Sequence, residues 1–325
     1  MTFLAYLFAV LKNAVYGTTV FFTSELTEST DVLDVLALRF LMSAVVFWLL
    51  KITRICKIRV GVKDFFQKGE RRSALKVVLL TALFEPVLYM LFETLGVSMS
   101  SNITAGVILS LSAVTSCIFE MVFLKEDSTL AQKIFLGLGI FGAVYIAVNT
   151  DTTSGKDSML GILFLILTVV SGSLFSVFSR KSSRSFGAME VTYVSCMLGA
   201  LVFNAVNVVR HLFAGDILHY FDPYMNVDNL IGFAFLAILS TIVATGMNNF
   251  ALGRMQSSTM AAFGGISTFV TIGVGMALGG EVLETYHIIG LVFILARMIG
   301  VSYIAIKRDR QKITLTASTP EKAEE

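Results

Sequence analysis

The 325-residue sequence predicts an all-α membrane protein with ten transmembrane helices, arranged as two inverted five-helix repeats. Three observations lead to this prediction: the composition, the distribution of Lys and Arg, and an internal repeat. Hydrophobic residues make up 55% of the chain and Asp, Glu, Lys and Arg only 15%, against about 25% charged residues in soluble domains. The apolar residues also come in long blocks, and a helix that crosses a bilayer needs roughly 20 of them.

Polar breaks between the apolar blocks set the boundaries of the predicted spans. Two of these breaks, at 98–101 and 253–258, are very short, but the apolar stretches around them are too long for one helix and must form hairpins. The first block has no basic segment before it and no cleavage site after it, so it is interpreted as a retained helix. The predicted spans are 3–24, 34–55, 75–98, 102–123, 132–150, 159–180, 188–210, 230–251, 257–279 and 286–306.

Lys and Arg predict the orientation of these spans. If the N-terminus lies inside, the outer segments hold only Lys156 and Arg210. The inner segments then hold the basic residues of 51–76, 125–133, 180–184 and 307–322, together with Arg254. Cytoplasmic loops are enriched in Lys and Arg, so both termini are predicted to be cytoplasmic, in a multi-pass protein of the inner cell membrane.

The two halves of the chain share a pattern. Residues 95–101 and 252–258 each begin with Leu-Gly, end with Ser-Ser and separate two apolar spans. An acidic turn follows later in each half, at 124–126 and 279–281, and a glycine-containing helix closes each half. Five helices is an odd number, so the second copy is inverted, an arrangement typical of secondary transporters with a site between the halves. The predicted units are 1–150, 151–306 and a disordered cytoplasmic tail, 307–325.

With these segments the chain resembles the drug/metabolite transporter superfamily, in its ten-helix EamA-type branch. The resemblance implies an exporter or uptake carrier for amino acids, other metabolites or drugs, with a central cavity. One departure is that many members have a proline early in the fourth and ninth helices, where this chain has Ser112-Ala113 and Ser267-Thr268. The segments that carry the resemblance are Leu36-Ala37-Leu38-Arg39-Phe40, Phe92 to Ser101, Phe123 to Glu126 with the Gly142 helix, Leu252 to Ser258, and Gly279-Gly280-Glu281 with the Gly290 helix.

Ionisable residues within the predicted spans are the first candidates for a site, because each costs about 2.5–3.5 kcal/mol to insert at the membrane centre. Lys12, Glu85 and Arg297 lie closest to the midplane, and Arg39 and Glu93 lie in the outer third. Near the midplane, the cations Lys12 and Arg297 thus stand against a single carboxylate, Glu85. Either a substrate anion or Glu93 compensates the surplus positive charge, or one of the two basic side chains extends to the membrane interface. Arg39 is close enough to its helix end to reach that interface, which is the alternative to a role in binding.

Glu85 precedes Pro86, the only proline inside a predicted span, so the helix is predicted to be interrupted near residues 82–86 and turned toward the cavity. A carboxylate there could take up and release a proton, which makes Glu85 the candidate proton-coupling group. The alternative is a structural pair between Glu85 and Lys12.

Several neutral polar residues complete the predicted substrate site, although each could instead form a hydrogen bond between helices. The predicted substrate-binding residues are Glu85, Lys12, Asn13, Tyr16, Tyr89, Arg297, Tyr193 and Asn248. Glu126 and Glu281 end helices and are interpreted as structural, and the Gly275–Gly279 spacing indicates close helix packing.

No enzyme activity, cofactor or metal site is predicted. The histidines His211, His219 and His287 lie at helix ends or loops, and their spacing with Asp216 and Asp222 matches no zinc site. A Walker sequence is absent from the sequence. A net charge of +2 gives no reason to expect a nucleic-acid partner, so the expected partners are the lipid bilayer and a small-molecule substrate, with a homodimer left open.

The predicted function is therefore secondary transport of a small amphipathic organic metabolite, amino acid-like or amine-like, by alternating access. The first alternative is a carrier for an anionic metabolite clamped by Lys12 and Arg297. The alternative from another class is a membrane-embedded enzyme or lipid-binding scaffold, for which no reactive constellation is visible.

Overall fold

A computed structural model of the chain describes residues 2–53, 70–123, 129–149, 157–182, 186–254 and 257–318. These residues are helical apart from short turns, and no strand occurs among them. The helices of the first half are α1 (Thr2–Ser29), α2 (Val32–Ile52), α3 (Glu70–Ala82), the π-helical η2 (Leu83–Leu88), α4 (Tyr89–Ser98), α5 (Asn102–Leu109), α6 (Ser112–Phe123) and α7 (Leu130–Asn149).

The second half begins with α8 (Met159–Ser182) and α9 (Ala188–Ala214). Two short 3-10 helices follow, η3 (Ile217–His219) and η4 (Asp222–Met225). The chain then continues through α10 (Val227–Ala234), the π-helical η5 (Phe235–Ala244), α11 (Thr245–Leu252), α12 (Ser257–Ala277) and α13 (Thr285–Ser318).

Among the described residues, six helical stretches are long and apolar enough to cross a membrane, so the chain is a membrane protein with several spanning helices. They are Leu4–Ser29, Val32–Ile52, Lys76–Ser98, Met159–Ser179, Ala188–Ala214 and Val227–Leu252. Large apolar side chains cover their outer faces, among them Val45, Trp48 and Leu201. In water such a surface would be unfavourable, whereas lipid tails solvate it.

Apart from shifts of a few residues at helix ends, the structure differs from the predicted spans in three places. The predicted span 102–123 is divided by a turn at Ser110 and Leu111 into α5 and α6. The predicted span 230–251 contains the π-helical segment η5, although this segment has no proline. Helix α13 continues to Ser318, past the predicted end at residue 306, because no proline or glycine interrupts 307–318.

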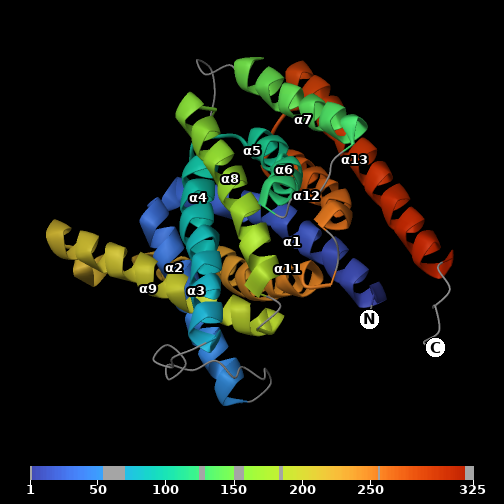
Figure 1. The fold of residues 1–325 in the computed structure, drawn as a ribbon. Helices are drawn as coiled ribbons and strands as arrows, with labels where there is room; N and C mark the ends of the chain where they lie inside the picture. Colours follow the sequence, from blue (N-terminus) through green and yellow to red (C-terminus); the bar gives the residue numbers. More distant parts are fainter. Residues whose placement is uncertain are drawn as a thin grey trace.

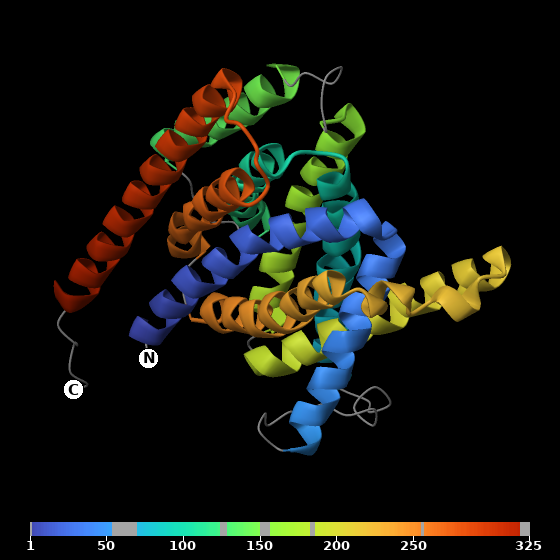
Figure 2. The same cartoon turned by 180° about the vertical axis from the view of Figure 1, so that it is seen from behind.

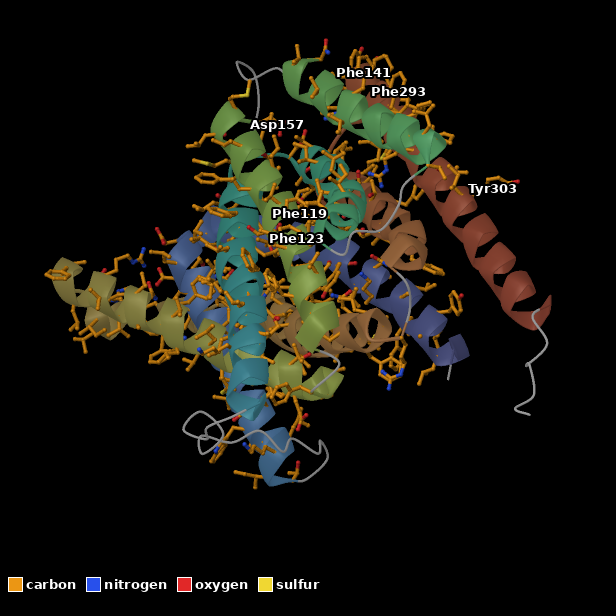
Figure 3. The ribbon with its side chains drawn as sticks, in the orientation of Figure 1. Phe119, Phe123, Phe141, Asp157, Phe293 and Tyr303 are labelled. Carbon is orange, nitrogen blue, oxygen red and sulfur yellow. The ribbon has the colours of Figure 1, made fainter. Side chains whose placement is uncertain are left out.

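Contacts between the halves organise the bundle. Helices α7 and α13, which close the two halves, lie side by side along one edge (Figures 1 and 2). Glycines bring them together: a methyl group added to Gly142 would lie 2.9 Å from the Gly290 carbonyl oxygen. Beside this contact Phe141 and Phe293 meet edge to face, with ring centroids 5.1 Å apart (Figure 3).

Helix α1 of the first half crosses the middle of the molecule and packs along α12 of the second half (Figure 2). Gly17 makes this contact close, because a methyl group added there would lie 2.5 Å from the Ser267 carbonyl oxygen and 2.7 Å from Val270 Cβ. The Thr271 hydroxyl donates a hydrogen bond to the Gly17 carbonyl oxygen at 2.9 Å. Backbone approach of this kind is a usual way for helices to associate in a membrane.

The contact at Gly17 gives a matched prediction for stability. Gly17→Ala should destabilise the protein by about 1–3 kcal/mol, since a backbone carbonyl cannot move aside as a flexible side chain would. Gly137→Ala in α7 is the control, because an added methyl group there meets nothing within 4 Å and alanine favours the helix. Thermal unfolding in detergent should show a lower Tm for Gly17→Ala alone; equal Tm values for the two variants would contradict the packing.

Candidate functional site

A cavity of about 160 Å³ lies between the two halves. It is lined by residues of α1, η2, α4, α5, α6, α8, η5, α11 and α12, so both halves contribute. Its polar lining residues are Lys12, Asn13, Tyr16, Thr19, Glu85, Tyr89, Glu93, Ser112, Ser116, Ser176, Ser240, Asn248, Ser267 and Thr271.

Equivalent positions of the two halves face this cavity. If Ser112 of the first half is aligned with Ser267 of the second, then Leu109 falls on Gly264 and Ser116 on Thr271. All six residues line the cavity. Small polar side chains, Ser112 and Ser116 of the first half and Ser267 and Thr271 of the second, therefore lie at matching places of the cavity wall.

The backbone at Glu85 interrupts the third predicted span, as the adjacent proline predicted. Glu85 has φ −139° and ψ 114°, an extended conformation between the helical turns on either side. Pro86 fits beside α9 because Gly199 has no side chain there; a methyl group on it would lie 2.8 Å from the Pro86 ring. Irregular backbone at membrane depth is tolerated where it is buried in protein or lines a cavity, and Glu85 lines this one.

The Glu85 residue is 8% exposed, and its carboxylate accepts no hydrogen bond from the described residues. It interacts electrostatically with Lys12, which also lines the cavity and has its ammonium group 5.4 Å from the centroid of the Tyr16 ring. No ion pair joins Lys12 to Glu85 within the described parts of the chain. Lys12 and Glu85 thus share the cavity lining without a direct ion pair, and the structural pair stays a prediction.

A second carboxylate, Glu93, belongs to the same wall. The Tyr89 hydroxyl donates a hydrogen bond to Glu93 Oε1 at 3.1 Å, while Oε2 is buried and finds no hydrogen-bond partner among the described residues. Arg39 interacts electrostatically with Glu93. The sequence indicates only the depth of Glu93, and its place in the cavity lining was missed.

Arg39 does not reach the membrane interface; it is 0% exposed. Its Nε donates to Thr241 Oγ1 and its Nη2 to Ser240 Oγ, both at 2.9 Å, while Nη1 has no hydrogen-bond partner among the described residues. Ser240 lines the cavity and is also within 3.0 Å of the Thr19 hydroxyl. Arg39 is therefore connected to the cavity lining through the Ser240 hydroxyl.

The helical stretch that carries Ser240 is irregular where it lines the cavity. The Thr241 hydroxyl donates to the Leu236 carbonyl five residues back at 2.8 Å, and Thr245 does the same to Ser240 at 3.3 Å. Both bonds lie in or next to a π-helical segment, a feature that is frequent at functional sites. The Tyr16 hydroxyl meets Thr245 Oγ1 at 3.2 Å. The third helix of each half is thus distorted where it borders the cavity.

Six of the eight predicted substrate-binding residues line this cavity: Lys12, Asn13, Tyr16, Glu85, Tyr89 and Asn248. Asn13 also donates its side-chain amide to the Ala9 carbonyl at 2.6 Å, so part of its polarity is used within α1.

Tyr193 and Arg297 are not among the residues that line the cavity. Tyr193 turns toward α2, where its ring meets Phe47 edge to face and Lys51 Nζ lies 4.8 Å from its centroid. Arg297 is buried on α13, the helix that pairs with α7 at the edge of the bundle. The expectation that both face the cavity is therefore not met, because packing turns these helix faces elsewhere.

His211 and Asp216 belong to a hydrogen-bond network centred on Asp34, a residue that was not predicted to have a role. Asp34 accepts from Arg210 at 2.6 Å and from Asn207 at 2.8 Å, and His211 Nε2 lies 2.8 Å from it. His211 Nδ1 lies 2.8 Å from Asp216. The network ties the N-terminal end of α2 to the C-terminal end of α9.

Two proteins similar to this chain are named as transporters. The chain is 29% identical over 296 residues to a Bacillus subtilis (strain 168) protein named "Uncharacterized transporter YcxC", covering 91% of this chain and 92% of that one. It is 22% identical over 324 residues to an "Uncharacterized transporter" of Clostridium kluyveri, covering 96% and 98%.

A solved structure titled "Crystal structure of protein" has the same fold, with a TM-score of 0.63 at 17% identity over 93% of this chain and 98% of that one. The sequence profile of the EamA-like transporter family matches residues 3–148 and again 159–303, once for each half. With its two matched halves and the cavity between them, this chain belongs to the EamA-like transporter family.

Proposed function

We propose that the chain is a secondary active transporter that moves a small amino acid-like or amine-like metabolite by alternating access. The observation that carries the proposal is the Glu85 carboxylate, which faces the cavity between the halves at a helix break and has no hydrogen-bond partner among the described residues. A buried charge of this kind requires compensation, and a cationic ligand or a proton supplies it.

The other cavity groups support this class of substrate. Glu85 and Glu93 offer two carboxylates, and the Tyr16 and Tyr89 rings line the same wall, where an ammonium group can make cation–π contacts. Lys12 supplies one cation for a substrate carboxylate. A cavity of about 160 Å³ suits a small molecule, since an engineered cavity of about 150 Å³ holds benzene.

The alternative of an anionic metabolite has less support. It needs Lys12 and Arg297 to converge on one ligand, and only Lys12 lines the cavity. Two carboxylates in the lining would also repel an anion that carries no ammonium group.

In the membrane, we infer ten spanning segments in two inverted five-helix repeats, 1–150 and 151–306, with both termini in the cytoplasm. The separate matches of the family profile to 3–148 and 159–303 support the two repeats. The scarcity of Lys and Arg in the predicted outer segments supports the orientation, in the inner cell membrane.

Glu85 is the group we assign to proton coupling. When it is protonated, the cavity keeps its shape but loses the charge that attracts a cationic substrate. Proton and substrate therefore compete for one carboxylate, which is the simplest way to couple their movements in opposite directions.

Ligand stabilisation tests the substrate class. Amino acids and primary amines should raise the Tm of the purified protein, because a ligand at 100 times its Kd stabilises the folded state by about 2.7 kcal/mol. Carboxylic acids of the same size without an amine should not. Stabilisation by the plain acids alone would contradict the proposal and favour the anion carrier.

The orientation is tested with single cysteines at exposed, described positions. Cysteines at Ser29 and Asn226 should react with a membrane-impermeant maleimide from outside the cell, and cysteines at Thr53 and Gly187 only from inside. Ser29 and Gly187 lie between the first two helices of each half, so labelling of both from the same side would rule out the inverted repeat.

Proton coupling is tested by flux into proteoliposomes with and without a pH gradient, using a ligand found by the Tm measurements. Glu85→Gln should abolish accumulation driven by the gradient and keep exchange of substrate across the membrane, because glutamine retains size and hydrogen bonding but carries no proton. Glu25→Gln, at an exposed position of α1 away from the cavity, is the control for loss of a carboxylate. Gradient-driven accumulation by Glu85→Gln at the rate of the unsubstituted protein would exclude this role.

A further inference from the structure

Glu281 of the second half holds the N-terminal turn of α5, which belongs to the first half. Glu281 Oε1 accepts hydrogen bonds from the backbone and side-chain nitrogens of Asn102, both at 2.8 Å. Glu281 Oε2 accepts from the Ile103 backbone at 2.9 Å. These contacts satisfy two backbone N–H groups that a helix N-terminus otherwise leaves without a partner.

Asp157, two residues before α8, holds the same turn from another direction. Its Oδ1 accepts from the Ser101 backbone at 2.7 Å, and its Oδ2 accepts from the hydroxyls of Thr104 at 3.0 Å and Ser101 at 3.3 Å. Thr104 Oγ1 also lies 3.1 Å from His287 Nε2 of α13. Figure 3 shows Asp157 at the end of the molecule where α8 begins. We call Asp157, Glu281 and the turn at 101–104 the α5 latch.

The backbone conformation after α12 places Glu281 beside this turn. Gly280 has φ +62°, a conformation that side chains with a Cβ rarely adopt, and it reverses the chain at the end of the helix. The Glu281 backbone then donates to the Gly275 carbonyl oxygen at 3.1 Å. A methyl group added to Gly275 would lie 3.1 Å from both Asn102 Cβ and Glu281 Oε2, so glycine is what leaves room for the latch.

The latch sits at the ends of two helices, α5 and α12, that line the cavity. On α5 and α6 the lining residues follow the latch along the chain, from Gly106 to Ser116, and an α-helix rises about 1.5 Å per residue. At Gly106, where the cavity lining on α5 begins, the two helices touch closely: a methyl group added there would lie 2.7 Å from Thr271 Cγ2. The latch therefore holds α5 against α12 at one end of the cavity.

We propose that Asp157 and Glu281 form a gate, which keeps the cavity closed on this side of the membrane while their bonds to α5 persist. The inference rests on the proposed alternating access and adds the residues that control one side of it. Opening on this side requires α5 to move away from the second half, which breaks all the carboxylate contacts together.

Three features suit this role. Every contact of the two carboxylates with the α5 turn joins the first half to the second, so the contacts respond to any relative movement of the halves. Helix α5 has only 8 residues and ends at the Ser110–Leu111 turn, so it can tilt without α6. The bonds are charge-assisted and lie at a helix N-terminus, where negative charge is favourable. Both carboxylates are only half-buried, so water can take the place of these bonds when they break.

The experiment measures access to the cavity and needs no substrate. A reporter cysteine at Ser112, on the cavity wall, is introduced after Cys56, Cys117 and Cys196 are replaced by serine. An impermeant maleimide is then applied from the Asp157 side in oriented vesicles. Glu281→Gln and Asp157→Asn should each increase the labelling rate about tenfold, because loss of charge-assisted bonds from the closed state shifts the equilibrium by that order.

Glu284→Gln is the matched control: it removes a carboxylate three residues from Glu281 that is exposed and makes no side-chain hydrogen bond to described residues, so labelling should not change. Asn102→Ala removes one of the three hydrogen bonds to Glu281 and should give a smaller increase in the labelling rate. This variant replaces the charge variants as the test if they do not fold. Labelling equal to that of the unsubstituted protein in the folded latch variants would overturn the gate. Absence of flux in the unsubstituted protein would instead overturn the proposed transport and leave the labelling result standing.

Discussion

Buried charge is the constraint on which the arrangement of this protein depends. Arg39 is fully buried among helices, and two hydroxyls of η5 and the charge of Glu93 compensate it. An ion in a low-dielectric interior is tolerated only when such partners are held in place. The partners of Arg39 come from the second half and from the third span of the first half, so this one side chain ties α2 to both walls of the cavity.

The same constraint explains why the two distorted helices both border the cavity. A regular α-helix uses its backbone polar groups internally and presents only side chains. At Glu85 the chain leaves the helical conformation, and at η5 hydroxyls of Thr241 and Thr245 bond to carbonyls five residues back. Around η5, Tyr16 of α1 and Arg39 of α2 supply hydrogen-bond partners that lipid cannot, whereas the Glu85 break borders the cavity.

Glycine decides where the halves can meet. Gly17 brings α1 onto α12, Gly142 and Gly290 bring α7 onto α13, and Gly275 lets the α5 turn reach Glu281. Contacts of this type let the backbones of paired helices approach closely. By contrast, the carboxylates of the α5 latch form discrete bonds that are either made or broken, which is what a gate between two states requires.

Much of the fold follows from sequence because hydropathy and proline act locally. Apolar blocks and their polar breaks located the helices, and Pro86 located the interruption at Glu85. The depth of Lys12, Tyr16 and Tyr89 within their predicted spans was enough to assign them to a shared cavity, which all three line. The π-helical segment η5 and the turn at Ser110 escaped prediction, since neither has a residue that forces it.

What depended on tertiary structure was the direction in which each helix turns its side chains. Span positions set the depth of a residue, but rotation about the helix axis depends on packing against neighbours. Packing turned Arg39 inward instead of toward the interface, and left Tyr193 against α2 and Arg297 on α13, away from the cavity. Contacts between distant segments, such as Asp157 with Ser101 or Glu281 with Asn102, exist only once the halves are docked. Sequence alone thus determined which residues lie at similar positions along the predicted spans, because hydropathy is read along one chain. Docking of the two halves decided which of them meet, because contacts are made between helices.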